Sequence, residues 1–330
     1  MNGVFDSLTP ESIIEVIEEE KKELFTGLIT PLPSYINRVY EIESMTGERY
    51  IAKFYRPGRW NLFSLKEEHQ FILDCANQEI PVVAPVILSS GSTLGKWKDC
   101  YFTLFPKKSG RELLLESDAV WRRLGSLIGR MHSVGMKRSA ENRLIMHPTN
   151  TTIPQRDKLL SGGWMSKTVA RDFSKVIDEI VEIALPLFKD INMHRIHGDC
   201  HRANILERPN EGLMIIDFDD MVTGPAIQDL WLLLPGYTNE CNREIDLILE
   251  GYELFLDFDD RQLKMIEVLR AMRMIYFLAW CSTQINDYRF VSLFPDWGSE
   301  QFWHKEITDL QKQLNIIKNC KYLRMDRYEY

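Results

Sequence analysis

Asp199, Asn204 and Asp217 bring two carboxylates and an amide together in a short stretch near the middle of the chain. Magnesium prefers oxygen ligands, usually one or two carboxylates together with phosphates. In phosphoryl transfer, a separate carboxylate must orient the attacking hydroxyl and accept its proton. These residue types therefore predict a site in which Asn204 and Asp217 hold Mg²⁺ and Asp199 serves as the base. Asp217 counts as a catalytic residue as well as a metal ligand.

The pattern around these residues predicts a hairpin that brings them together. Residues 205–206 and 213–216 are apolar and are typical of two short strands, and 209–212 is a turn signal. A turn centred on Asn210 and Glu211 would place Asn204 opposite Asp217. Directly opposed residues have Cβ atoms roughly 5 Å apart, close enough to share one metal ion. Asp199 would face the space in front of that ion.

Two other interpretations of this stretch remain open. The first is a zinc site, because the ligand-type residues here have spacings that suit zinc: His194, His197, Cys200 and His201. Zinc would leave Asn204 and Asp217 unexplained, and no second ligand pair is evident elsewhere. The second is an ordinary hydrogen-bonded loop or an inactive phosphoryl-transfer enzyme. The presence of all three oxygen-bearing side chains favours phosphoryl transfer.

Composition limits the class of protein. The chain has 330 residues, of which 45% are hydrophobic and 27% charged, which is typical of a soluble globular protein with room for two lobes. Its net charge of −8 argues against nucleic-acid or anionic-membrane partners. The six cysteines show no CxxC pair, which fits a reducing compartment. The acidic N-terminus lacks a signal pattern, and the apolar segment 274–281 is too short to span a bilayer. We expect a cytoplasmic protein.

The N-terminal part contains candidate phosphate-binding residues. A helix is predicted from Pro10, capped by Thr9, and strands are predicted at 39–42 and 50–55. The loop 34–38 before them has no glycine-rich motif. Its backbone N–H groups and the Ser34 hydroxyl could still hold phosphate oxygens, although a plain β-turn is the alternative. Lys53 would lie on the inner face of the sheet.

A helix following these strands supplies a partner for Lys53. Ser64 and Glu67 have the spacing of a capping box, which predicts that the helix starts at Ser64. Glu68 falls on the apolar face of this helix, where a carboxylate needs a partner. We expect Glu68 to pair with Lys53, with Glu67 as the alternative.

The remaining pattern is mostly helical. Further strands are predicted at 80–86 and 101–105, a helix from Ser117 that carries a core or capping His132, an irregular connection at 137–165 and a helix at 167–187. Asp229 is expected to be buried at a helix start, where it would bond to the backbone of the loop around Asp199. Three more helices are predicted at 245–256, 263–281 and 301–317. Arg270 and Arg273 in the second could pair with core acids or recognise the acceptor.

The segment His-Gly-Asp-x-His-x-x-Asn, followed by the hairpin and a hydrophobic-Asp pair, resembles the catalytic core of the choline kinase and aminoglycoside phosphotransferase superfamily. The resemblance implies an α+β, two-lobed, protein-kinase-like fold. Residues 1–106 would form a small β-rich N-lobe and 107–330 a larger helical C-lobe with the catalytic loop. It also implies that Lys53 lies beside the ATP phosphates and that the backbone near Leu104 and Phe105 meets the adenine.

The chain is also similar from end to end to a bacterial subfamily of stress response kinases. The stretches that carry this likeness are 34–40, 53–60, 67–71, 80–85, 197–206, 224–233 and 269–280. The likeness implies a cytoplasmic serine/threonine protein kinase linked to oxidative and envelope stress. By this likeness Asp199 is the proton acceptor, Asn204 and Asp217 are magnesium ligands, and Ser34 contacts ATP. One departure is Ile36, where an acidic residue is expected.

Three hypotheses follow. The leading one is an ATP- and Mg²⁺-dependent kinase, monomeric, that phosphorylates a protein on serine or threonine and has no nucleic-acid or membrane partner. The second keeps the chemistry but makes the acceptor an amino alcohol, a sugar or an antibiotic. The third is a non-catalytic scaffold that binds nucleotide or a partner protein.

Overall fold

A computed structural model describes residues 5, 7–34, 36–208, 211–285 and 288–320. Backbone contacts divide the chain into two compact units. The N-terminal unit consists of Met1–Leu114 and Arg202–Asp219, and the C-terminal unit of Leu115–His201 and Asp220–Tyr330. The sequence predicts lobes at 1–106 and 107–330, and this division stays a prediction. By its contacts, the segment Arg202–Asp219 groups with the N-terminal unit.

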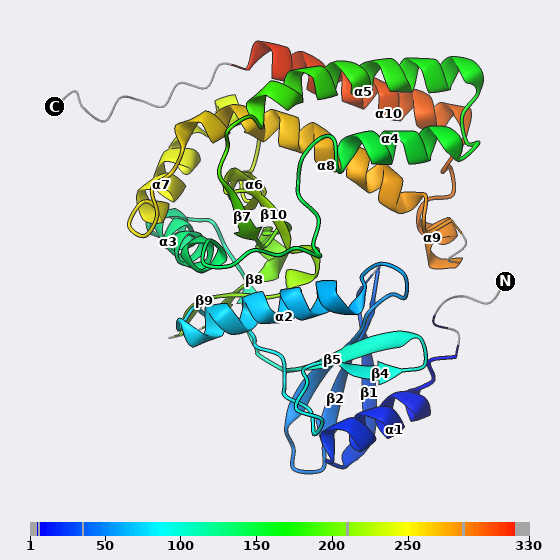
Figure 1. Ribbon diagram of the computed structural model, residues 1–330, viewed down its shortest axis with the longest axis vertical. Coiled ribbons are helices and arrows are strands. Elements are labelled where there is room, and N and C mark those ends of the chain that lie inside the picture. The colour runs from blue at the N-terminus through cyan, green and yellow to red at the C-terminus, as the bar shows by residue number, and fades with distance from the viewer. Residues whose placement is uncertain (1–4, 6, 35, 209–210, 286–287, 321–330) are drawn as a thin grey trace. The chain divides into compact units, whose positions relative to one another are not determined.

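The N-terminal unit is built on an antiparallel sheet in the order β1-β2-β3-β5-β4. Its strands are β1 (Phe25–Leu32), β2 (Arg38–Ser44), β3 (Arg49–Phe54), β4 (Gly95–Trp97) and β5 (Cys100–Pro106). Helix α1 (Pro10–Lys21) is capped by Thr9 as predicted and buries its apolar side in the same core as the sheet (Figure 1). The sequence pattern misses β1, because Gly27 has a positive φ of 79° and the pairing register shifts between Phe25 and Ile29.

Two predictions in this unit were wrong. Helix α2 (Leu62–Asn77) begins before Ser64, because the Asn61 side chain accepts the Ser64 N–H at 2.8 Å and caps the helix there. Residues 80–86 do not form a strand. Pro81 and Pro85 have no N–H to donate to a ladder. The segment makes an isolated bridge from Val82 to Ile215 and a hydrogen bond from the Val86 N–H to the Leu104 carbonyl.

The predicted hairpin is present, but its register differs by one residue from the prediction. It consists of β8 (Ile205–Arg208) and β9 (Gly212–Ile215), joined at one edge by β6 (Arg111–Glu112). Ile205 pairs with Ile215 and Arg208 with Gly212, so the connection is longer than the two-residue turn that was expected. Asn204 is therefore not directly opposite Asp217, and its carbonyl instead accepts the Ile216 N–H at 3.0 Å. Asn210, the predicted turn centre, lies outside the described residues.

The C-terminal unit is mainly helical. Its helices are α3 (Asp118–Gly135), α4 (Thr152–Ser161), α5 (Lys167–Leu187), α6 (Ile227–Trp231), α7 (Asn242–Tyr252), α8 (Ile266–Cys281), α9 (Tyr288–Leu293) and α10 (Glu300–Asn319). Strands β7 (Met193–Ile196) and β10 (Val222–Pro225) pair antiparallel. The bounds of α5 are those the sequence predicts. The connection 137–165 was predicted to be irregular, but it contains α4, whose largely polar sequence gives only a weak helical pattern.

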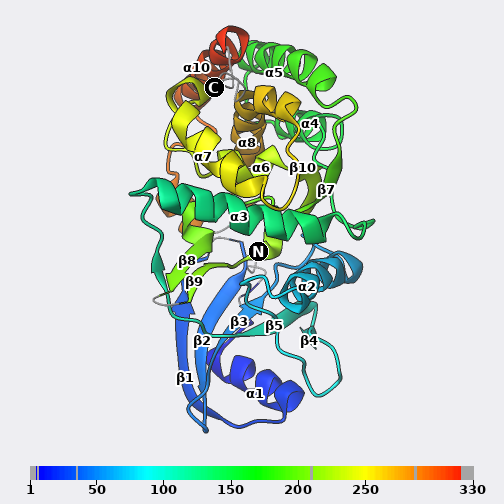
Figure 2. The ribbon, with the colours of Figure 1, turned by 90° about the vertical axis from the view of Figure 1, so that its left-hand side faces the viewer.

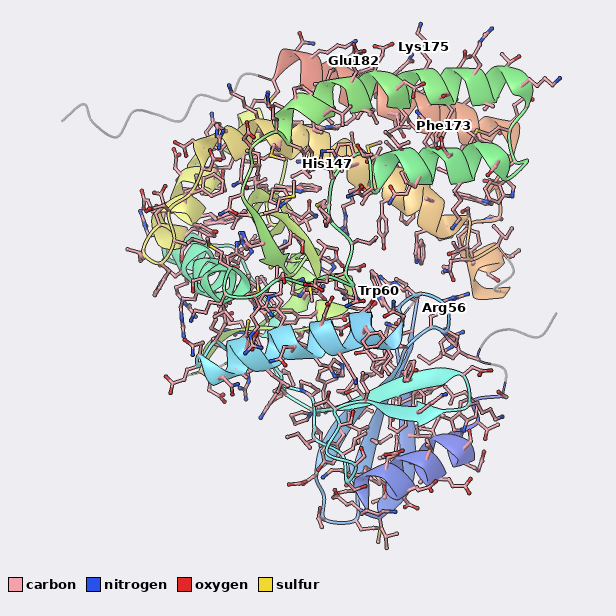
Figure 3. The ribbon with its side chains drawn as sticks, viewed as in Figure 1. Arg56, Trp60, His147, Phe173, Lys175 and Glu182 are labelled. Carbon is pink, nitrogen blue, oxygen red and sulfur yellow. The ribbon has the colours of Figure 1, made fainter. Side chains whose placement is uncertain are left out.

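Helices α4, α5, α8 and α10 pack around one apolar core. Figures 1 and 2 show α5 and α10 side by side. Figure 3 shows Phe173 of α5 pointing into this core, where its ring centroid lies 5.5 Å from that of Trp303, whereas Lys175 and Glu182 lie on the outer face of the helix. In the part of the chain that is described, no helix has both the length and the hydropathy needed to cross a bilayer.

Helices α3 and α7 approach each other closely because glycines lie at their crossing. A Cβ on Gly125 would lie 1.8 Å from the Ile248 carbonyl oxygen, and one on Gly251 would lie 1.9 Å from the Arg122 carbonyl oxygen. This close packing brings His132 near the end of α3 and Tyr252 of α7 within 3.0 Å of each other. Both side chains are buried, so His132 is a core histidine, as predicted.

Candidate active site

Strand β3 places Lys53 beside the aspartates that follow the hairpin. Its Nζ lies 2.7 Å from Asp217 Oδ1 and 3.5 Å from Asp219 Oδ1. The Lys53 side chain is only 7% exposed, whereas that of Asp217 is 52% exposed. Burial alone would lower the pKa of Lys53, but the charges of Asp217, Asp219 and Glu68 raise it above its ordinary value. The ammonium group therefore stays charged next to the predicted metal ligand.

Glu68 is completely buried on the inner side of α2. The Tyr55 hydroxyl donates to its Oε1 at 3.0 Å, and the same hydroxyl lies 2.9 Å from His69 Nε2. Glu68 also acts on Lys53 through its charge. These observations place Glu68 in the polar cluster around Lys53. Its role as the ion-pair partner that holds Lys53 stays a prediction.

Asp219 belongs to this cluster, although the sequence does not predict a role for it. It is buried, and its carboxylate is paired with Lys53 and with Arg59. Arg59 comes from the segment after β3, which also contains Arg56 and Trp60 (Figure 3). The sequence feature that could have identified Asp219 is the cluster of acids at 217, 219 and 220, directly after an apolar strand. Two cations beside one carboxylate lower the cost of burying Asp219.

The predicted phosphate loop lies between β1 and β2. Ser34 is partly exposed there, and Tyr35 lies outside the described residues. Asn37 is buried, and its amide oxygen accepts the Arg56 N–H at 3.1 Å, which ties this loop to the segment after β3. A role for Ser34 in binding ATP stays a prediction.

The predicted adenine contacts lie on β5. Leu104 is buried, and its carbonyl oxygen accepts the Val86 N–H at 2.7 Å, while Phe105 is partly exposed. The Leu104 carbonyl is thus already engaged within the N-terminal unit. Contacts of Leu104 and Phe105 with adenine stay predictions.

Asp199 lies in the C-terminal unit, in the loop that follows β7. Arg273 Nη2 is 2.8 Å from its Oδ1, and His201 Nε2 is 3.3 Å from its Oδ2. Burial alone would raise the pKa of Asp199, but the hydrogen bond from His201 and the charge of Arg273 hold that pKa below its ordinary value. The carboxylate is therefore ionised at neutral pH, as a proton acceptor must be.

Asp229 holds the loop that carries Asp199. It is completely buried on α6 and accepts the backbone N–H groups of His197 at 2.7 Å and Gly198 at 2.8 Å. His132 Nε2 lies 2.9 Å from the same carboxylate. Gly198 has a φ of 83°, and a Cβ there would lie 2.2 Å from the Asp220 carbonyl oxygen. These contacts confirm the predicted role of Asp229 in bonding to this backbone.

The structure gives the zinc interpretation no support. His194 packs edge-on against His132 with ring centroids 4.8 Å apart, and the ring nitrogen Nδ1 of His197 accepts the Asp199 N–H at 3.3 Å. Among the residues that are described, no group of three or more His, Cys, Asp or Glu side chains is arranged to hold a metal ion. By contrast, Asn204 and Asp217 offer an amide oxygen and a carboxylate, and both are donors of the hard type that Mg²⁺ prefers.

His194 should make the protein less stable in mild acid. Burial, reinforced by His132, lowers the pKa of His194 to about 3 despite the opposing charge of Asp229. Below a pH of about 6.5 the unfolded chain protonates His194 and the folded chain does not. The stability that depends on neutral His194 is therefore fully present only above that pH. It is lost as the pH falls toward 3, by up to about 1.4 kcal/mol per pH unit.

Urea unfolding at pH 7, 6 and 5 should show a shallower loss of the free energy of unfolding for His194→Gln than for the unsubstituted protein. The exposed His304→Gln control should behave like the unsubstituted protein, and identical slopes in all three would contradict the assignment.

Comparisons with known proteins identify the family of the chain. The model of the phosphotransferase enzyme family matches residues 28–266. Stress response kinase A of Escherichia coli (strain K12) is 36% identical over 315 residues, which are 95% of each chain. Serine/threonine protein kinase RdoA of Salmonella typhimurium (strain LT2) is 34% identical over 314 residues, which are 95% of this chain and 94% of that one.

Solved structures show the same fold. Amicoumacin kinase hAmiN, in complex with AMP-PNP, Ca²⁺ and Ami, has a TM-score of 0.69 at 18% identity and covers 93% of this chain and 92% of its own. A microcompartment-associated aminopropanol kinase has a TM-score of 0.69 at 15% identity and covers 93% and 96%. The α+β kinase-like fold predicted from the motifs is thus confirmed. The chain therefore belongs to the phosphotransferase enzyme family and, within it, to the stress response kinase A group.

Proposed function

We propose that the protein is an ATP- and Mg²⁺-dependent serine/threonine protein kinase. The observation that carries the chemistry is the 2.7 Å contact between Lys53 and Asp217, since it sets a phosphate-binding ammonium beside a metal-binding carboxylate. The names of the relatives in Escherichia coli and Salmonella typhimurium support a protein acceptor and a role under stress, which we take to be oxidative or envelope stress. The six free thiols support a cytoplasmic location.

In this proposal each residue has one task. Lys53 orients the α- and β-phosphates of ATP. Asn204 and Asp217 would hold Mg²⁺, which would neutralise phosphate charge. The acceptor oxygen attacks the γ-phosphorus, the bond from that phosphorus to the bridging oxygen of ADP breaks, and the hydroxyl proton passes to Asp199. Asp229 fixes the backbone at residues 197 and 198, so that Asp199 needs little reorientation for the reaction.

Transfer from [γ-³²P]ATP tests the proposal directly. The purified full chain would be incubated with Mg²⁺ and either generic protein substrates or small acceptors such as an amino alcohol and an aminoglycoside. We expect label on serine or threonine of the proteins. Label on the small acceptors alone would support a small-molecule phosphotransferase, and no transfer to any acceptor, with ATP binding that Mg²⁺ does not tighten, would support the scaffold hypothesis.

Lys53→Met should lower kcat/KM for ATP by about 10²-fold or more, because a preorganised charge on the phosphates is lost. The exposed Lys66→Met on α2 is a matched control in the same unit and should leave kcat/KM unchanged. Thermal unfolding of both variants would show whether the fold is intact. Near-normal kcat/KM in a folded Lys53→Met variant would remove Lys53 from the site.

A further inference from the structure

Arg273 of α8 reaches the carboxylate proposed as the catalytic base. Its Nη2 lies 2.8 Å from Asp199 Oδ1, although the two residues are far apart in the sequence. The Arg273 side chain is 38% exposed and that of Asp199 is 20% exposed, so both are partly accessible to an acceptor. A guanidinium carries five N–H donors in a planar fork, more than its ion pair with Oδ1 can use. Arg273 can therefore bind Asp199 and a second oxyanion together.

Helix α8 carries three aromatic side chains close to Arg273. Tyr276, Phe277 and Trp280 follow Arg273 at spacings that place all four on one face of α8. Phe277 is 43% exposed, and its ring stacks on Trp280 with centroids 5.7 Å apart. Asp220 also faces this row, where the Tyr276 hydroxyl donates to its Oδ1 at 3.4 Å. Exposed rings beside a guanidinium are common at sites that bind polypeptides.

The position of Arg273 bears on which acceptors can react. An acceptor hydroxyl must come within hydrogen-bond distance of Asp199, which brings its neighbouring groups close to Arg273. An ammonium beside the hydroxyl, as in an amino alcohol, would be repelled by the guanidinium. The charge of Asp199 would not offset this repulsion, because Arg273 already compensates that charge. A carboxylate beside the hydroxyl would instead gain charge-assisted hydrogen bonds.

We propose that Arg273 is a specificity residue that selects serine or threonine acceptors flanked by an acidic side chain and disfavours acceptors with a positive charge next to the hydroxyl. This inference rests on the proposed function, because it takes Asp199 as the base. The aromatic row Tyr276, Phe277 and Trp280 would bind the apolar part of the same peptide.

Three peptides that differ only in the residues flanking a single serine, which are Asp, Gln or Lys, would test this with the full-length protein, Mg²⁺ and ATP. We expect kcat/KM to fall in the order Asp, Gln, Lys, with about a 10-fold advantage of Asp over Gln that lies mainly in KM. Arg273→Gln should reduce this ratio to near one. Arg273→Lys, which keeps the charge but not the fork, should give an intermediate ratio.

The exposed Arg243→Gln, in the same unit, is the matched control and should keep the ratio of the unsubstituted protein. A preference for the Lys peptide, or an Asp preference that survives in Arg273→Gln, would overturn the inference while leaving the kinase function intact. If Arg273→Gln has no measurable activity, an undiminished ratio in Arg273→Lys overturns it. Phosphorylation of amino alcohols with none of the peptides would overturn both this inference and the proposed function.

Discussion

Asp199→Asn is expected to lower kcat for phosphoryl transfer by about 10³-fold and to leave the affinity for ATP nearly unchanged. The amide has the size of the carboxylate but cannot accept the proton of the acceptor hydroxyl. ATP is held by other residues in the proposed mechanism, so its binding should persist. Steady-state kinetics with a phosphorylated protein substrate, combined with calorimetric titration of ATP, would measure both quantities.

The groups around Asp199 determine the pH range in which this prediction holds. His201 and Arg273 keep the pKa of Asp199 below its ordinary value, so its base form is present throughout the neutral and weakly acidic range. The exposed Asp172→Asn on α5 is a matched control and should retain full kcat. A folded Asp199→Asn variant with near-normal turnover would show that another group accepts the proton.

Asp229→Ala should lower the free energy of unfolding by about 4 kcal/mol, because it removes a buried acceptor from three donors at once. The backbone N–H groups of His197 and Gly198 would lose their partner, as would His132. We also expect kcat to fall by at least about 10-fold under conditions where the variant is folded, because the loop that carries Asp199 is no longer held. Urea unfolding and steady-state kinetics at low temperature would measure the two effects.

A double-mutant cycle separates this role from general packing. His132→Ala and Asp229→Ala remove two ends of one hydrogen bond, so their effects on the free energy of unfolding should be clearly less than additive. The exposed Asp257→Ala should change that energy by less than about 0.5 kcal/mol. Additive losses for the first pair, or an unchanged kcat in Asp229→Ala, would argue against the positioning role.

Much of the local structure could be predicted because local interactions determine it. Thr9 and Pro10 start α1, and the regular apolar repeat of α5 gives both of its ends. The segment around Asp199 and Asn204 identified the family, since its residue types and spacing serve one chemistry. Where local signals compete, prediction failed: Asn61 caps α2 in place of Ser64, and prolines prevent a strand at 80–86.

The sequence by itself therefore determined the family, the chemistry and most of the helices and strands. The tertiary structure decided which charged groups meet. It shifted the hairpin by one residue, brought Asp219 to Lys53 and Arg59, and placed Arg273 on Asp199. Periodicity shows only that a side chain is buried or exposed. The partner of a buried charge comes from a distant element, and that choice depends on how the elements pack rather than on neighbours along the chain.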